Sequence, residues 1–200
     1  AANDRSLTIT AGTGSVTFSD DIGTAQALAD LDVTAATITF NRAVTQTVQV
    51  DDQGGNTATL AGGVVLATNL LVDTDGVADN SVTFAGTVNA DDAVANARTL
   101  MVTSDSGAAT FGGDVGTTQA LADLDVTAAT INLNAATIQV DDEGANTVTL
   151  NGSVVLGANV AIDTDGAADN NVRFTGTINA DNAAANNRTL TVMAGTGVAA

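Results

Sequence analysis

Pairs of apolar residues two positions apart recur along the whole chain, separated by threonine, asparagine, aspartate and glycine. This spacing is typical of β-strands that bury one face, and the abundance of Thr, Val, Ile and Phe favours strands over helices. The first series of pairs is Leu7/Ile9, Leu31/Val33, Val48/Val50, Leu70/Val72, Leu100/Val102, Leu124/Val126, Ile138/Val140, Val160/Ile162 and Leu190/Val192. A second series between them is Val16/Phe18, Ile38/Phe40, Ala58/Leu60, Val82/Phe84, Ala109/Phe111, Ile131/Leu133, Val148/Leu150 and Val172/Phe174. A weaker third series is Ile22, Val44, Val64/Leu66, Val88, Val115, Val154/Leu156 and Ile178.

The chain is internally repeated. Residues 22–40 (IGTAQALADLDVTAATITF) return at 115–133 (VGTTQALADLDVTAATINL), an offset of 115 − 22 = 93 residues. Residues 184–197 (AANNRTLTVMAGTG) match residues 1–14 (AANDRSLTITAGTG). We therefore predict one continuous solenoid segment over residues 1–200, with long repeats at about 6–98 and 99–188 and a partial third repeat at 189–200. Because its last residues match its first, the sequence ends at the point of the repeat at which it begins. This suggests a window of a longer array, or a unit that continues head to tail.

The order of the three series predicts how the strands are arranged. Members of the first series, counted from Leu7, are spaced by 24, 17, 22 and 30 residues and then by 24, 14, 22 and 30. All five phenylalanines fall in the second series, which predicts one aromatic ladder if the coils stack about 4.8 Å apart. We therefore predict an all-β fold, a parallel β-helix of about nine coils, with three strands per coil and four coils per repeat.

Composition narrows the function classes. The chain has 23 acidic and 5 basic residues, a formal net charge of −18, and no His, Cys or Pro. The lack of His and Cys excludes disulfides, Cys/His metal sites and Ser–His or Cys–His catalysis. The acidic charge argues against nucleic acid and anionic membranes as partners, and 44% hydrophobic residues are too many for a disordered acidic tail. The start of the sequence lacks the cationic and apolar regions of a signal peptide.

Four segments resemble the repeats of giant bacterial surface exoproteins. They are SLTITAGTGSVTF (6–18), ALADLDVTAATITF (27–40), VTLNGSVVLGANV (148–160) and NNVRFTGTINA (170–180). The resemblance is to the filamentous-haemagglutinin-like β-solenoids and covers essentially the whole chain. It implies a right-handed β-helix that serves outside the cell as an adhesin stalk or matrix fibre, and it supplies no catalytic residues. This chain departs from that pattern by filling turns with Asp where many relatives carry Gly, Ser or Thr.

Acidic residues gather in the loops between the first and second series. If these loops stack along one edge of the rod, two consecutive loops offer five or six carboxylates, together with Asn80 or Asn170, to a hard cation such as Ca²⁺. Neither the EF-hand nor the glycine-rich calcium nonapeptide is present, and Asp, Asn and Gly are also ordinary turn residues. The candidate metal ligands are Asp51, Asp52, Asp73, Asp75, Asp79, Asp141, Asp142, Glu143, Asp163, Asp165 and Asp169.

Threonine and arginine positions suggest two further readings. Outward residues of the second series, such as Thr37/Thr39 and Thr57/Thr59, form a Thr-x-Thr pattern that resembles the ice-binding face of some antifreeze proteins, although Thr is also the ordinary polar residue of an exposed strand. Arg5, Arg98 and Arg188 occupy one repeat position, just before the first series, and are expected to pair with nearby Asp residues or to cap strand ends.

The sequence predicts a structural function. Nearly every acidic residue recurs at its repeat-equivalent position or is replaced there by Asn, whereas an active site normally occurs once, so we expect no enzyme. The leading hypothesis is an extracellular, cell-surface segment of a bacterial adhesin or matrix protein that acts as a stiff acidic spacer or assembles into a filament. Its expected partners are adjacent repeats or identical units placed head to tail. The alternatives are a Ca²⁺-binding module and, third, ice binding.

Overall fold

The computed structural model describes residues 5–51, 54–76, 79–91, 97–141, 143–144, 146–166, 169–181 and 187–200. This part of the chain contains β-strands and no helix, as predicted. The first eight strands are β1 (Ser6–Thr10), β2 (Ser15–Phe18), β3 (Asp30–Phe40), β4 (Gln46–Gln49), β5 (Thr57–Leu66), β6 (Leu70–Asp73), β7 (Ser81–Phe84) and β8 (Val88–Ala90). The others are β9 (Thr99–Phe111), β10 (Asp123–Leu133), β11 (Thr137–Gln139), β12 (Thr147–Leu156), β13 (Val160–Asp163), β14 (Asn171–Phe174), β15 (Ile178–Ala180) and β16 (Leu190–Met193).

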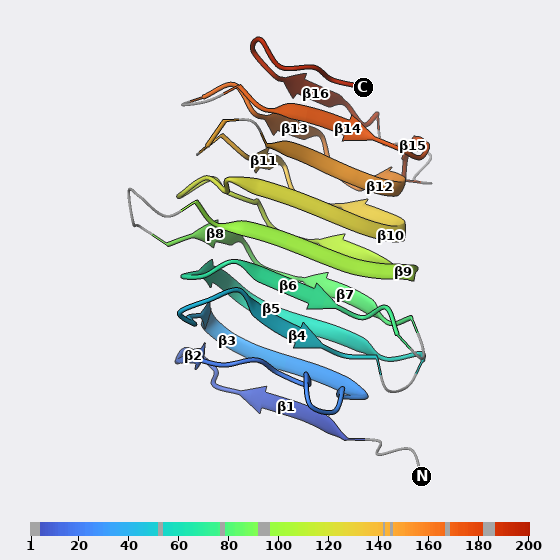
Figure 1. The fold of residues 1–200 in the computed structure, drawn as a ribbon. Coiled ribbons are helices and arrows are strands. Elements are labelled where there is room, and N and C mark those ends of the chain that lie inside the picture. The colour runs from blue at the N-terminus through green and yellow to red at the C-terminus, as the bar shows by residue number, and fades with distance from the viewer. Residues whose placement is uncertain are drawn as a thin grey trace.

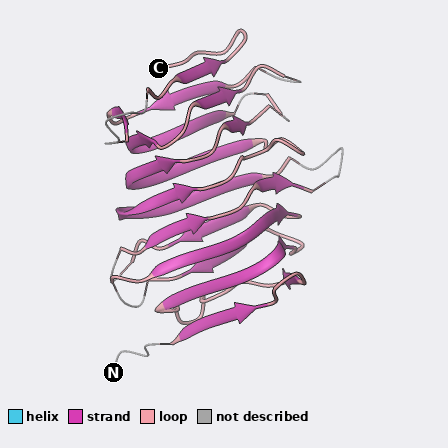
Figure 2. Cartoon of the chain, turned by 180° about the vertical axis from the view of Figure 1, so that it is seen from behind, coloured by secondary structure: helices cyan, strands magenta, loops and turns pink. Residues whose placement is uncertain are grey.

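All the paired strands run parallel to their neighbours and form a β-solenoid of about 7 turns, which confirms the predicted fold class (Figure 1). The turns are stacked along one axis from β1 to β16, and Figure 2 shows the same stack from behind. The described residues include no helix that is long and apolar enough to cross a membrane.

Strand pairing divides the solenoid into three faces, which the chain visits in the order 1, 2, 3. Face 1 consists, in stacking order, of β1, the first half of β3, the first half of β5, the whole of β7, the second halves of β9, β10 and β12, and finally β15. Face 2 consists, in stacking order, of β2, the second half of β3, the second half of β5, the whole of β8, the isolated parallel bridge at Val115, and then β11, β13 and β16. Face 3 consists, in stacking order, of the isolated parallel bridge at Ile22, the strands β4 and β6, the first halves of β9, β10 and β12, and finally β14.

The core is a narrow aliphatic column inside the three faces. The inward residues of the strand pairs, such as Leu31, Leu60 and Val126, are fully buried or nearly so. Burial of such side chains contributes about 1.5–3 kcal/mol each, and it repeats with every turn. Stability in this architecture is therefore distributed along the rod rather than concentrated in one centre.

The repeat does not contain a whole number of turns. From Leu7 to Leu100 the chain advances by 11 strand positions: Val16, Ile22, Leu31, Ile38, Val48, Ala58, Val64, Leu70, Val82, Val88 and Leu100. At three positions per turn, 11/3 is about three and two-thirds turns. Equivalent residues of successive repeats therefore lie on different faces, with Leu7 on face 1 and Leu100 on face 3.

This geometry corrects the expected nine coils and four coils per repeat. That count included Val44 as a strand position, but Val44 is 60% exposed and lies between β3 and β4. Without it, the twelve predicted positions of the first repeat become eleven, the same number as in the second repeat. A lone apolar residue in a loop has the same local signature as a short buried strand, so periodicity by itself does not separate the two.

The phenylalanines form two stacked pairs rather than one ladder. Phe18 and Phe40 stack on face 2 with ring centroids 5.5 Å apart, and Phe84 and Phe111 stack on face 1 at 5.3 Å. Phe174 lies on face 3, where it is paired with Leu150. The prediction of a single aromatic wall was wrong, because it assumed that the repeat returns to the same face.

Candidate functional site: the acidic corners

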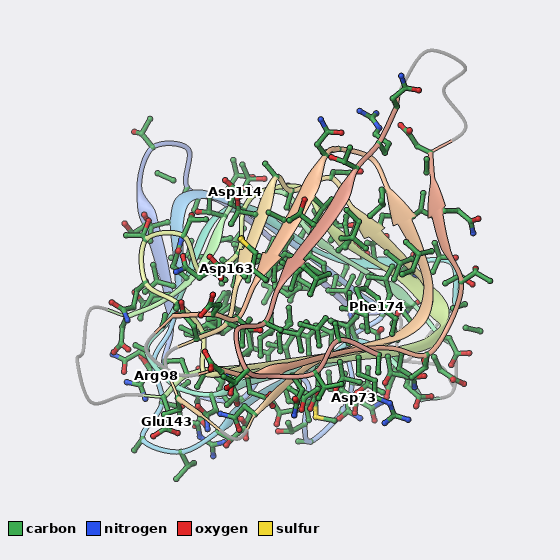
Figure 3. All side chains as sticks on the ribbon, turned by 90° about the horizontal axis from the view of Figure 1, so that it is seen from above. Asp73, Arg98, Asp114, Glu143, Asp163 and Phe174 are labelled. Atoms are coloured by element: carbon green, nitrogen blue, oxygen red, sulfur yellow. The ribbon has the colours of Figure 1, made fainter. Side chains whose placement is uncertain are left out.

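The predicted acidic residues lie on two corners of the solenoid rather than on one edge. In the first repeat, Asp51 and the loop after Asp73 connect face 3 to face 1. In the second repeat, Asp141 and the loop after Asp163 connect face 2 to face 3. Viewed along the axis, Asp73 and Glu143 lie well apart around the cross-section (Figure 3). The expected single acidic edge is wrong for the same reason as the aromatic ladder. Asp52 and Asp142 lie outside the described residues.

Three carboxylates converge at the corner of the first repeat. Asp75, Asp79 and Asp105 each place an oxygen within 4.8 Å of the others. Asp79 also accepts a hydrogen bond from the hydroxyl of Ser106 on the next turn. Asp75 and Asp79 were among the predicted ligands, whereas Asp105 was not. Asp75 and Asp105 are exposed and Asp79 is partly buried. Ca²⁺ takes six to eight oxygens, so these three carboxylates are at most part of a coordination sphere.

Asp105 occupies a backbone conformation that its repeat equivalents fill with glycine. Its φ is 37°, and the matching residues Gly12 and Gly195 have φ of 56° and 53°. The corresponding sequences are AGTG (11–14), SDSG (104–107) and AGTG (194–197). Left-handed backbone disfavours residues with a Cβ, although Asp tolerates it better than most. Alignment of these three turns was the sequence signal that would have singled out Asp105.

The second repeat has no third carboxylate at the matching corner. Gly195 stands where the first repeat has Asp105, and a Cβ there would lie 2.4 Å from Asp169 Oδ1. Asp169 accepts hydrogen bonds from the hydroxyl and the backbone N–H of Thr196, the latter at 3.0 Å. These bonds hold the pKa of Asp169 below its usual range. This carboxylate is thus used to bind a turn of the same chain.

Asp51 and Asp141 are buried against glycines of the next turn. Asp51 accepts a hydrogen bond from the Gln49 side chain at 3.0 Å, and Asp141 accepts one from Gln139 at 3.0 Å. A Cβ at Gly76 would lie 2.2 Å from Asp51 Oδ2, so this approach requires glycine. Both carboxylates are therefore packing elements of the corner.

The two asparagines considered as metal ligands are buried clamps. Asn80 donates to the carbonyl of Val50 at 3.1 Å and accepts from the backbone N–H of Asn56 at 3.1 Å. Asn170 makes the corresponding bonds to Val140 and Asn146, at 3.2 and 3.1 Å. Each side chain is 1% exposed, and its amide is satisfied by the previous turn. They fix the acidic loops rather than offer ligands to solvent.

The same device recurs at other corners. Acidic and amide side chains accept hydrogen bonds from backbone N–H groups one turn further along the chain. These pairs are Asp21–Thr47, Asp30–Thr57, Asn69–Thr99, Asn89–Thr118, Asp114–Thr137, Asp123–Thr147, Asn159–Thr189 and Asn171–Val198. Many polar side chains of the loops therefore join one turn to the next through hydrogen bonds.

Two aspartates carry a raised pKa. Burial is the main cause for Asp73, with the nearby Asp51 and Asp75 carboxylates adding to it against a hydrogen bond from the Asp75 backbone. Burial is also the main cause of the raised pKa of Asp123, and the charge of Asp125 adds to it. Both aspartates thus hold their negative charge less easily in the folded chain than in water.

Arginine pairing follows the prediction at two positions. Arg98 makes a two-pronged ion pair with Asp91, at 2.8 and 2.9 Å, and Arg188 makes the equivalent pair with Asp181, at 2.9 and 2.7 Å. The pairing with Asp181 raises the pKa of Arg188. These partly exposed pairs close long loops in both repeats, where such pairs contribute about 0–1 kcal/mol.

The threonine series is divided among the three faces. Thr17 and Thr39 pair on face 2, Thr59, Thr83 and Thr110 follow one another on face 1, and Thr149 lies on face 3. A single flat Thr-x-Thr array along the rod is therefore not formed. Ice binding was suggested by a Thr-x-Thr array on one face, which the sequence already interrupts at Ala108, Asn132 and Arg173.

No family model, curated protein or solved structure matches this chain. The corners consequently have to be interpreted from their own geometry. Many of their carboxylates and amides bind neighbouring turns, and among the residues that the structure describes one group of three carboxylates remains, at Asp75, Asp79 and Asp105. Such a corner is suited to structural cohesion and to association with cations.

Proposed function

We propose that this chain is an extracellular structural segment of a bacterial surface or matrix protein. It acts as a stiff acidic spacer, with right-handed winding as in the exoproteins that its sequence resembles. The observation that carries this proposal is the use of the polar corners: side chains such as Asn80, Asn170 and Asp30 bind backbone groups of an adjacent turn. Bonds of this kind resist bending of the rod at every turn, which is the property a spacer needs.

A tandem fusion tests the spacer. Residues 18–200 are joined directly after residue 200, because Ala200 corresponds to Thr17 in the repeat. We expect small-angle scattering to give an unchanged cross-section and a length increased by about 35 Å, from 22 further strand positions at three per turn and about 4.8 Å per turn. A hinged or compact particle would contradict the proposal. Antibodies against the chain should also label intact cells of the source bacterium.

The convergence of Asp75, Asp79 and Asp105 favours a second candidate, a segment that takes up Ca²⁺ to stiffen the rod. Weak sites of extracellular modules have dissociation constants of about 10⁻⁴–10⁻³ M. Thermal unfolding is compared in millimolar Ca²⁺, in equal Mg²⁺ and in chelator. A melting temperature that rises only with Ca²⁺, and no longer rises in Asp105→Gly, supports this candidate. Equal melting curves in Ca²⁺, Mg²⁺ and chelator would leave only the spacer function.

A further inference from the structure

An open groove crosses the outer surface of face 3. It has a volume of about 390 Å³ and runs over the first halves of β9, β10 and β12 and over β14, which follow one another along the stack (Figure 1). Strand register places its outward side chains in two rows along the rod axis. The first row is Met101, Asp125, Thr149 and Arg173, and the second is Thr127, Asn151 and Thr175.

The first repeat has the same two rows on face 1, with plainer side chains. There the first row is Thr8, Asp32, Thr59 and Thr83, and the second is Thr34, Ala61 and Ala85. The second repeat keeps three of these residue types and changes four: Met101 replaces Thr8, Arg173 replaces Thr83, Asn151 replaces Ala61 and Thr175 replaces Ala85. A repeated residue serves the solenoid, but four departures that meet in one groove indicate a function of that groove.

Arg173 provides a positive charge at one side of the groove. It is exposed, and no carboxylate of the described residues lies within ion-pair distance of its guanidinium, whereas Arg98 and Arg188 each pair with an aspartate. A guanidinium binds a carboxylate through two parallel N–H···O bonds, which makes it a specific partner for that group. In this groove the matching carboxylate is left for a ligand to supply.

Asp125 provides the opposite charge. It lies on the far side of Thr149 from Arg173, so the two backbones are two strand spacings, about 9.6 Å, apart. Asp125 also interacts with the neighbouring Asp123. Burial is the main cause of the raised pKa of Asp123, and the charge of Asp125 adds to it. A cation placed at Asp125 relieves this repulsion.

The second row makes a polar wall beside these charges. The Thr175 hydroxyl donates to Asn151 Oδ1 at 2.5 Å, and Asn151 Nδ2 donates to the Thr127 hydroxyl at 3.4 Å. These bonds hold the Asn151 amide across three strands. Next to Asp125, Met101 is 48% exposed and adds an apolar surface. A few fixed polar groups beside an apolar side chain are typical of a small-ligand site.

We propose that this groove binds a short peptide in its zwitterionic form, with the peptide carboxylate on Arg173 and the peptide ammonium beside Asp125. Three extended residues span about 10 Å, which matches the separation of β10 and β14. The peptide then crosses Thr149 and lies along Asn151. This site goes beyond the spacer function and does not depend on it.

Net charge favours a zwitterion over other charged ligands. With a charge of −18 the chain repels polyanions, although Arg173 could bind their acidic groups. A polycation is attracted to all the acidic corners and gains nothing specific from the groove. A ligand with one charge of each sign is not repelled as a whole, and its two ends match Arg173 and Asp125 in one orientation.

Titration with triglycine, followed by NMR at low salt, tests the site. The probes are triglycine, N-acetyl-triglycine, which lacks the ammonium, and triglycine amide, which lacks the carboxylate. We expect the backbone amide signals of Thr149 and Arg173 to shift with triglycine. Each blocked peptide should bind about fivefold more weakly, which is the factor that one partly exposed ion pair allows.

Two variants connect each charge of the groove to one end of the peptide. Arg173→Thr, which restores the residue of the first repeat, should bind triglycine about fivefold more weakly and no longer distinguish it from its amide. Asp125→Asn should likewise no longer distinguish triglycine from its N-acetyl form. Arg42→Thr is the control, because it removes the same charge outside the groove and should leave all three affinities unchanged. Circular dichroism checks that each variant is folded.

Equal binding of the three peptides by the parent chain, or no binding at all, would overturn the proposal. So would an unchanged preference for the free carboxylate in Arg173→Thr. Tighter binding of a uronic-acid disaccharide than of triglycine would overturn the peptide in favour of an acidic sugar. None of these results touches the spacer proposal, which fails only if the tandem fusion is not a straight rod.

Discussion

Phe84 and Phe111 stack in successive turns, with ring centroids 5.3 Å apart and ring planes 10° from parallel. Both side chains are fully buried on face 1. Phe111 is the repeat equivalent of Phe18, which lies on face 2 and stacks on Phe40. Repeat equivalents therefore lie on different faces, because the repeat does not contain a whole number of turns.

Loss of this stack is expected to be costly. Phe111→Ala removes a buried ring and leaves a cavity, so we expect the free energy of unfolding to fall by about 3–5 kcal/mol. Phe174→Ala is the matched control, because its ring is only half-buried, and its cost should be clearly smaller. Urea unfolding followed by circular dichroism measures both. Equal losses would mean that the Phe84–Phe111 contact is not a special source of stability.

The buried amide of Asn80 should stabilise the corner of the first repeat. Asn80→Ala leaves the Val50 carbonyl and the Asn56 N–H without their partner, and each such group costs about 1–3 kcal/mol. Asn151→Ala is the control, since Asn151 is exposed and the first repeat has Ala61 at this position. We expect that control to stay within about 0.5 kcal/mol of the parent in chemical unfolding.

Replacement of Asp105 by glycine should stabilise the chain by about 1 kcal/mol, because it removes backbone strain at a left-handed φ and one of three adjacent negative charges. The greater flexibility of glycine in the unfolded chain offsets part of this gain. The reverse change, Gly195→Asp, should destabilise, since a Cβ there meets Asp169 Oδ1 at 2.4 Å. Melting temperatures of the two variants should therefore move in opposite directions. A shift of both in one direction would rule out this account of the turn.

Stability should rise as the pH falls below 7 through the raised pKa values of Asp73 and Asp123. A carboxyl whose pKa is raised on folding penalises the folded state when it is ionised, and this penalty is relieved as the pH falls through the raised pKa. Asp73 and Asp123 are such groups, and lower charge also reduces repulsion across the rod. Thermal unfolding of dilute protein measures the effect, since the sequence pI is about 4.1.

Asp73→Asn separates the local part of this pH effect from general repulsion. It removes the penalised charge and keeps an oxygen that accepts from the Asp75 N–H, so the melting temperature at pH 7 should rise and its pH dependence should weaken. Asp163→Asn, the same position in the second repeat, controls for the loss of one negative charge. Identical curves for the two variants would assign the whole effect to net charge.

Several features were predictable because their signals are local. Alternation of inward and outward residues correctly marked pairs such as Leu31/Val33 and Val126/Leu124 as core, and the all-β parallel solenoid is confirmed. The pairing of Arg98 and Arg188 with aspartates in their own loops is confirmed as well. In each case the interacting groups lie a few residues apart or obey a short period.

The candidate site was less predictable because its parts come from different turns. Asp75 and Asp79 meet Asp105, which lies on the following turn at a glycine-like φ. Asn80 looked like a potential ligand in the sequence, yet its amide is used inside the corner. Which polar group faces solvent depends on the neighbouring turn, and the sequence of one loop does not indicate which residues of that turn lie beside it.

The sequence by itself determined that short strands stack in parallel and which side chains point inward, because both follow from a two-residue period and the self-similarity of the chain. Only the tertiary structure decided which face each strand occupies. That assignment accumulates along the chain. The exposure of Val44 takes one predicted strand position out of the first repeat and turns everything after it by a third of a turn. The physical reason is that winding is a running sum over all preceding loops, whereas burial of a strand is a local property.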